Sequence, residues 1–391
     1  MKDTAIKKLI DAEKKRQKSV INLIASENYV SKDVLEALGS ELTNKYGEGY
    51  PGNRYYRGMI VADQVEILAQ KRALKLFGLA ENKWSVNVQP LSGSPANLAV
   101  YSALVPPGQK IMGMALAHGG HLTHGQKVSM TGKFWNSVLY GLNRETELID
   151  YEEVKKMAVA EKPNIIVAGY TAYAHIVDWK KFREIADAAG ALLMVDMSHF
   201  AGLVAGGEYP PPFTYADIVT TTTHKTLRGP RSALIFSRID ERGINKKIDK
   251  AIIPGLQGGP HFNQIASVAV ALKEAASPDF KKYARQVIKN AKVLASELSR
   301  LGWRVIEGGT ETHLLRIDVW QNGKGLGGRE AADRLENEGI IVNENTIPFD
   351  TRPPIDPSGI RIGTAAETTR GRKEKDMKKI AERIDKILRK K

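Results

Sequence analysis

The chain contains no cysteine among its 391 residues. Disulfide bonds, thiolate catalysis and cysteine-based metal sites are therefore excluded, and a reducing compartment fits this composition. No apolar run reaches the roughly 18 residues that a transmembrane helix needs. The N-terminal stretch MKDTAIKKLIDAEKKRQK is charged throughout and lacks the apolar segment of a secretory signal. We therefore expect a cytoplasmic protein without a membrane anchor.

Acidic residues are the scarcer charge, with 44 against 58 basic residues and a formal net charge of +14. Such an excess is one signature of nucleic-acid binding. Here much of it lies at the two ends of the chain, and no RNA-binding motif with interleaved aromatic residues accompanies it. Met377, Ile380, Ile384 and Ile387 recur at helical spacing in the basic tail, which predicts an amphipathic helix. We interpret the charge as a solvated basic surface and do not expect a nucleic-acid partner.

Short apolar runs alternate with amphipathic stretches through the middle of the chain. The expected strands are SVNVQP, KIMGMAL, NIIVAG, ALLMVDM, DIVTTTT and SALIFS, with helical patterns such as PANLAVYSALV and WKKFREIADAAG between them. This alternation predicts an α/β fold with a mostly parallel sheet flanked by helices. Ligands of such sheets bind beyond the carboxyl ends of the strands, so the residues that follow each strand are the first candidates for a site.

A second region begins after the glycine-rich LQGGP at 256–260. It contains a long helical pattern with an expected break at Ser277-Pro278, then the strand-like WRVIEG and THLLRIDVW, and finally the tail helix. We expect a large domain at 51–265 and a smaller α+β domain at 266–391. The sequence shows no internal repeat, and no long linker separates the two expected domains.

Small residues follow the first expected strand in LSGSPANLAVYSAL. Ser94 is a suitable helix N-cap, and Pro95 would then occupy the first helical position. Free backbone N–H groups at a helix start bind phosphate, although an ordinary capped helix explains the same pattern.

Two further strands are followed by ionisable residues. Asp196 comes directly after ALLMV, where a carboxylate needs a partner such as a cationic ring nitrogen; a helix-capping aspartate is the alternative. Lys225 comes after the β-branched run TTTT, where a lysine with a partly suppressed charge is a nucleophilic amine; an exposed loop lysine is the alternative.

The segment HGGHLTHG places His118, His121 and His124 three residues apart. Such spacing suggests a metal site, but the Gly-Gly pair argues against a rigid helix and no acidic residue lies within the motif. We expect no metal and prefer an imidazole that packs on a flat cofactor ring.

Together these pieces match what pyridoxal 5'-phosphate requires of a protein. A lysine amine forms a Schiff base with its aldehyde, an aspartate keeps its ring nitrogen protonated, and a small-residue helix start holds its phosphate. A pyridoxal phosphate site therefore explains why Lys225 stands at the end of an apolar strand. No single motif explains this as well.

From residue 23 to about 377 the chain also resembles the serine hydroxymethyltransferases. The motifs that carry the resemblance are LIASENYVS, LTNKYGEGYPGNRYY, HGGHLTHG, VDMSHFAGLVAGG, TTTTHKTLRGPR, LQGGP and SGIRIGTAAETTRG. The resemblance implies fold type I, that of aspartate aminotransferase, and a homodimer with shared active sites; a tetramer stays open. It also implies an N-terminal arm at 1–50 that contacts the partner subunit.

The resemblance implies roles for particular residues. Lys225 forms the Schiff base, Asp196 pairs with the pyridine nitrogen, and His121 stacks on the ring. The cofactor shell is completed by Ser92, Gly93, Ser94, Thr171, His199, Thr222 and His224, with Gly258 and Gly259 reaching the phosphate of the neighbouring subunit. Arg231 steadies the loop after the lysine.

The remaining implied residues bind the substrates. Arg361 grips the amino-acid carboxylate with its two-pronged donor geometry, joined by Ser26 and by Tyr46 and Tyr56 of the partner chain. Glu48 is the proton-transfer candidate beside the folate, and the pterin pocket is lined by Tyr55, Leu116, Gly120, Leu122 and Asn345.

The implied activity moves the hydroxymethyl carbon of serine reversibly to tetrahydrofolate, the co-substrate, and leaves glycine. A folate-independent aldolase that cleaves 3-hydroxy amino acids is the alternative enzyme, and a basic RNA-binding protein is the alternative of another class. Two departures from the family pattern concern the folate side: Pro95 replaces a usual glutamine, and Pro353, Pro354 and Ile355 replace a Ser-Pro-Phe-like segment. Neither touches Lys225, Asp196 or Arg361.

Overall fold

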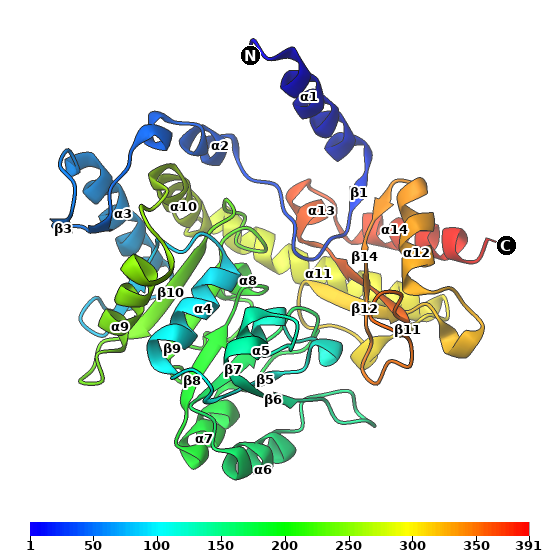
Figure 1. Ribbon diagram of the computed structural model, residues 1–391. Helices are drawn as coiled ribbons and strands as arrows, with labels where there is room; N and C mark the ends of the chain where they lie inside the picture. The colour runs from blue at the N-terminus through cyan, green and yellow to red at the C-terminus, as the bar shows by residue number, and fades with distance from the viewer. Residues whose placement is uncertain (391) are drawn as a thin grey trace.

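The computed structural model describes residues 1–390 and has a seven-stranded sheet in its larger part (Figure 1). The strands run in the order β4-β10-β9-β8-β7-β5-β6. Neighbours from β9 to β6 are parallel, whereas β10 is antiparallel to both β9 and β4. Their bounds are β4 Trp84–Asn87, β5 Lys110–Met114, β6 Asn136–Tyr140, β7 Ile165–Gly169, β8 Leu192–Asp196, β9 Ile218–Thr222 and β10 Ala233–Arg238. The predicted mostly parallel sheet is confirmed.

Two details of this sheet were not expected from the sequence. Strand β6 was missed because it is an edge strand whose polar and half-buried residues lack a continuous apolar run. Strand β10 returns antiparallel because no helix lies between it and β9, and a parallel return needs a crossover of a dozen or more residues.

Helices cover both faces of the sheet, and the alternation of side chains along β7 shows why. Ile165 and Val167 belong to a core with α4 and α9, whereas Ile166 and Ala168 belong to a core with α3, α6, α7 and α10. The helices of this part are α3 Ile60–Leu76, α4 Gly93–Leu104, α5 Met130–Phe134, α6 Tyr151–Glu161, α7 Trp179–Ala189, α8 Ala201–Ala205, α9 Ile244–Lys250 and α10 Phe262–Ala275.

A smaller antiparallel sheet forms in the C-terminal part, in the order β11-β12-β15-β14. It packs against α11, α12 and α14, and Met377, Ile380, Ile384 and Ile387 of the tail helix are all buried there, as predicted. The bounds are α11 Pro278–Arg300, β11 Arg304–Val305, β12 Leu314–Asp318, α12 Gly328–Asn337, β13 Ile340–Ile341, β14 Asn343–Asn345, β15 Gly359–Gly363, α13 Ala365–Thr369 and α14 Glu374–Leu388.

Helix α11 connects the two parts. Ser277 caps it through a hydrogen bond from the N–H of Phe280, and Pro278 occupies its first turn, so the predicted break is confirmed. Its 23 residues span about 34 Å. Phe280 and Val287 pack into the core of the large sheet, whereas Leu294 packs into the core of the small one. Because one helix packs into both cores, it holds the large and the small sheet in a fixed relative position.

The N-terminal segment is solvent-accessible in its first helix and buried in the residues that follow it. Helix α1 (Thr4–Ser19) has no buried residue and projects from the rest of the chain in Figure 1. The following Ile21 and Leu23 belong to the core of the small sheet, with β1 (Ile21–Asn22) paired to β13. Helix α2 (Lys32–Leu38) and the hairpin of β2 (Gly49–Tyr50) and β3 (Asn53–Arg54) follow. The domain boundaries stay a prediction. Within residues 1–390, no helix is long and apolar enough to cross a membrane.

Candidate active site

Lys225 lies just beyond the carboxyl end of β9, whose five residues are all buried. Its side chain is only 9% exposed, and its Nζ donates a hydrogen bond to Thr222 Oγ1 at 3.1 Å. Burial lowers the pKa of Lys225 to about 8; Asp196 opposes this shift, and the cations Arg361 and Arg231 add to it. Lys225 is therefore not an exposed loop lysine, and its amine is partly neutral and nucleophilic near neutral pH.

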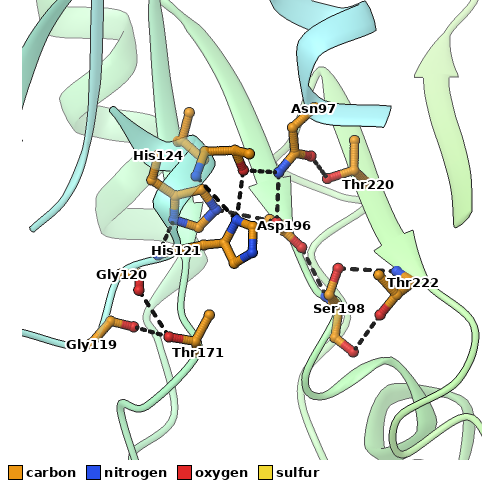
Figure 2. A network of polar contacts seen from close by, with 12 residues as sticks. Asn97, Gly119, Gly120, His121, His124, Thr171, Asp196, Ser198, Thr220 and Thr222 are labelled. Atoms are coloured by element: carbon orange, nitrogen blue, oxygen red, sulfur yellow. Dashed lines mark hydrogen bonds and ion pairs between the residues drawn. The ribbon is translucent and has the colours of Figure 1, made fainter. Parts of the chain in front are cut away.

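Asp196, at the end of the neighbouring strand β8, is held by three donors (Figure 2). Its Oδ2 accepts from Asn97 Nδ2 at 2.9 Å and contacts His124 Nε2 at 3.2 Å, while its Oδ1 accepts from the N–H of Ser198 at 3.0 Å. Burial favours the neutral acid, but the His124 contact and the charge of Lys225 outweigh it and hold the pKa of Asp196 well below its usual range. The side chain is an ionised, oriented acceptor, and it does not cap the following helix α8, whose N-cap is Phe200.

The three histidines of the HGGHLTHG loop point to different partners. His121 Nδ1 contacts Thr123 Oγ1 at 2.7 Å, beside the Asp196 group, and burial lowers the pKa of His121 to about 4. His118 instead accepts a hydrogen bond from the N–H of Leu142 at 2.8 Å. Within residues 1–390, no group of three or more His, Asp or Glu side chains is placed to hold a metal ion. The flat ring of His121 is therefore neutral, and it lies beside the Asp196 group.

The start of α4 differs in detail from the prediction. The N-cap is Ser92, and the expectation that Ser94 is the cap and Pro95 the first helical residue is wrong by two positions. Proline fits there because the first-turn N–H groups have no partner within a helix. No side chain caps the N–H groups of Gly93 and Ser94. A Cβ on Gly93 would lie 2.7 Å from the Thr222 methyl, so only glycine lets α4 approach β9 this closely.

Arg361 reaches the same region from β15 of the small sheet. Its Nη1 donates to the carbonyl of Thr171 at 2.8 Å, and its Nε donates to Asn343 Oδ1 at 3.1 Å. Burial lowers the pKa of Arg361 to about 10, and the nearby charge of Arg316 adds to this. Thr171 Oγ1 donates in turn to the carbonyl of Gly120, which links the strand end of β7 to the histidine loop. Ser26 follows Ala25, which packs on Gly363 at the end of the same strand β15.

Two other predicted cofactor residues have protein partners. His199 Nδ1 lies 3.3 Å from His313 Nε2, and the rings of this buried pair stack with centroids 5.4 Å apart. His224 Nε2 lies 3.5 Å from Arg231 Nη1, and burial lowers the pKa of His224 to about 3. Burial also holds the pKa of His199 well below its ordinary value, so both histidines are neutral and add no charge near Lys225.

A second group of predicted residues gathers at the surface. Tyr46 donates a hydrogen bond to Glu48 Oε1 at 2.8 Å, and a Cβ on Gly259 would lie 2.6 Å from the Tyr46 ring. Glu48, Tyr55 and Gly258 line an open cavity of about 440 Å³. Tyr46, Tyr55 and Tyr56 are 50%, 77% and 42% exposed. Among the described residues, no hydrogen bond or ion pair joins this group to Lys225, Asp196 or Arg361.

The predicted pterin residues divide between these regions. Leu116 and Gly120 lie in the loop after β5, where a Cβ on Gly120 would overlap the carbonyl of Met114. Leu122, in the same loop, is 44% exposed. Asn345 ends β14 and donates to the carbonyl of Thr346 at 2.7 Å. Residues 353–355, which depart from the family pattern, lie in a loop whose flanking residues Arg352 and Asp356 form an ion pair.

Several residues that hold the site were not predicted. Asn97, from α4, bridges Asp196 to Thr123 and Thr220, and His124 contacts Asp196 directly. Ser198 accepts from the N–H of Thr222 and so ties β8 to β9. Asn97 could have been noticed in the sequence from its position. It is a polar residue one turn into α4, with mainly apolar neighbours in the helix.

Pyridoxal phosphate fits this arrangement. The site offers a buried amine of lowered pKa for an aldehyde, an ionised carboxylate for a protonated ring nitrogen, and a neutral imidazole beside them. It also offers uncapped N–H groups at the start of α4 for a phosphate.

The family model named serine hydroxymethyltransferase matches residues 1–384. The chain belongs to the serine hydroxymethyltransferase family. A protein of that name from Desulfotalea psychrophila is 55% identical over 99% of this chain and 88% of its own length. Proteins of the same name from Acidobacterium capsulatum and Koribacter versatilis are each 54% identical, over 98% and 99% of this chain and 87% and 89% of their own lengths. The resemblance expected from the motifs is confirmed, and with it fold type I.

Proposed function

We propose that this chain catalyses the reversible transfer of the serine hydroxymethyl carbon to tetrahydrofolate, which gives glycine and 5,10-methylenetetrahydrofolate. The observation that carries the proposal is the burial of Lys225 and Asp196 at the carboxyl ends of the neighbouring strands β9 and β8, with Arg361 near enough to lower the pKa of Lys225, in a chain of the serine hydroxymethyltransferase family. Pyridoxal phosphate is the cofactor; when bound, it supplies an electron sink for charge that develops at the substrate α-carbon.

The residues of the chain divide the remaining work. The partly neutral amine of Lys225 would hold the aldehyde of pyridoxal phosphate, and Thr222 orients its Nζ. Ionised Asp196, fixed by Asn97 and His124, keeps a proton on the ring nitrogen. Arg361 would bind the substrate carboxylate with Ser26, and His121 would hold the cofactor ring by packing against it.

The active unit in this proposal is a homodimer with shared sites. Tyr46, Glu48 and Gly258 form an open surface group, and among residues 1–390 no hydrogen bond or ion pair joins it to Lys225. A second copy of the chain would place this group over the first copy's lysine, with Glu48 moving the proton and Gly258 and Gly259 closing on the phosphate. The N-terminal arm at 1–50, which includes helix α1 with no buried residue, would then pack on the partner. Tyr55, Leu116, Gly120, Leu122 and Asn345 would enclose the pterin.

The decisive experiment measures serine-dependent formation of 5,10-methylenetetrahydrofolate by the purified, cofactor-loaded protein. We expect formation that requires both serine and tetrahydrofolate. In the same preparation with glycine, the visible absorption band of the bound cofactor should shift to long wavelength only when tetrahydrofolate is added. Cleavage of 3-hydroxy amino acids together with a complete lack of response to folate would contradict the proposal.

A further inference from the structure

Two arginines lie side by side in the wall of the site. Arg316 of β12 and Arg361 of β15 are direct partners in an antiparallel pair, so their side chains leave the small sheet on the same face. Arg316 is 1% exposed, and Arg361 is partly buried. Two like charges at opposed positions repel each other, and burial strengthens the repulsion because little water screens it. One of these cations therefore needs a carboxylate.

The protein supplies a carboxylate to only one of them. Glu307 forms an ion pair with Arg316, and both side chains are almost completely shielded from solvent. Among residues 1–390, Arg361 has no acidic partner; it contacts only the Asn343 side-chain amide and the Thr171 carbonyl. Arg361 is thus the free guanidinium, and Arg316 is the neutralised one.

Glu307 also lies next to the segment that Arg361 contacts. Its Oε2 accepts a hydrogen bond from the N–H of Ala174 at 2.7 Å, three residues after Thr171. Burial raises the pKa of Glu307, while Arg316 and the Ala174 N–H oppose this shift. A guanidinium does not lose its proton in a protein, so the carboxyl beside it stays ionised at neutral pH. Without Arg316, this buried carboxylate would be unpaired, with Arg361 as the guanidinium directly across the sheet.

We propose that Arg316 is a positioning residue which occupies the Glu307 carboxylate and thereby keeps Arg361 free for the carboxylate of the amino-acid substrate. This deepens the function proposed above and rests on it. Removing Arg316 would let Glu307 draw Arg361 away from the substrate, and its negative charge would also repel the substrate carboxylate. Both effects weaken amino-acid binding. Removing Glu307 leaves an extra cation near the substrate and does not compete for Arg361.

The test uses two variants that break the same ion pair from opposite sides, Arg316→Met and Glu307→Gln, and the variant that carries both. The glutamine keeps an acceptor for the Ala174 N–H. For each cofactor-loaded protein, the dissociation constant of glycine is measured by calorimetry, KM and kcat for serine are determined, and the unfolding temperature is recorded. Arg183→Met serves as a matched control, because it breaks ion pairs with Asp187 and with Asp217, and Asp217 lies at the amino end of β9, opposite to the end that carries the site.

We expect Arg316→Met to weaken glycine binding about tenfold or more and to raise the KM for serine, with a smaller change in kcat. Glu307→Gln should bind glycine at least as tightly as the wild type, although both single variants unfold at lower temperature. The double variant should return to within about threefold of the wild-type glycine affinity. Arg183→Met should lower the unfolding temperature without changing glycine binding.

A purely structural ion pair predicts another pattern, in which both single variants weaken glycine binding in parallel with their loss of stability. That result, or a double variant that binds glycine as weakly as Arg316→Met, would overturn the inference. If the wild-type protein itself failed to bind glycine or to use serine, the proposed function would fail instead, so the two failures are distinguishable.

Discussion

The two groups of predicted site residues differ in how far one chain completes them. The Lys225 group is largely buried and hydrogen-bonded, with side chains from α4, β8, β15 and the segment after β9. The Glu48 group has three tyrosines that are between 42% and 77% exposed and an open cavity. Aromatic side chains are costly to leave in water, and exposed apolar patches mark surfaces that are covered by a partner. This difference supports the proposal that the Lys225 group is complete within one chain and that a second copy of the chain covers the Glu48 group.

The largest expected effect comes from removing the amine at the centre of the buried group. Lys225→Ala should lower the rate of serine-dependent folate methylenation by on the order of 10³-fold or more, because Lys225 is the one buried lysine among residues 1–390. Turnover assays on the folded variant measure this. Retention of more than a tenth of the wild-type rate would show that Lys225 does not hold the cofactor.

The next effect tests the sharing of sites directly. Glu48→Gln should lower the rate by roughly 10²-fold or more if Glu48 moves a proton. Co-expression of this variant with Lys225→Ala should restore activity to about a quarter of the wild-type value, since half of randomly assembled dimers then carry one intact site out of two. Mixed dimers without recovered activity would place Glu48 and Lys225 in the same site of one chain and would rule out the proposed exchange.

A smaller effect should come from the support of Asp196. Asn97→Ala removes a hydrogen bond to a buried carboxylate, worth about 1.5–3 kcal/mol, and should weaken pyridoxal phosphate binding by roughly tenfold to a hundredfold. Equilibrium dialysis of the apoprotein measures this. Asn143→Ala, in an exposed turn, is the control and should leave cofactor affinity unchanged. Equal cofactor affinities for both variants would show that Asn97 does not contribute to pyridoxal phosphate binding.

The smallest effect concerns pH. Because the pKa of Lys225 falls to about 8 in the folded chain, the unfolded chain binds more protons above that pH. The free energy of unfolding of the apoprotein should therefore rise as pH increases from about 8 toward the ordinary lysine pKa near 10.4. Lys225→Met should lose this part of the slope and unfold at higher temperature near pH 7. Denaturant titrations at several pH values measure it, and an identical slope in the variant would mean that Lys225 is not buried as a suppressed cation.

Much of the fold was readable from local patterns. The apolar runs around Ile166 and Val219 identified buried strands, the Ser277-Pro278 pair identified a helix start, and the spacing of Met377 and Ile380 identified an amphipathic tail. The edge strand β6 was missed because its burial is partial, and the start of α4 was misplaced because serines at 92 and 94 are equally suitable caps. Neither error moved Lys225 or Asp196 from the strand ends.

The sequence by itself determined the chemistry. A lysine after one strand, an aspartate after the next and an arginine within a shared motif are residue types whose reactivity is intrinsic, and their motifs identified the family. Only the tertiary structure decided how these groups are tuned. The suppressed charge of Lys225, the anchoring of Asp196 by Asn97 and the separation of a paired Arg316 from a free Arg361 all depend on contacts between segments far apart in the chain. Such contacts arise from burial and strand register, which local periodicity does not specify.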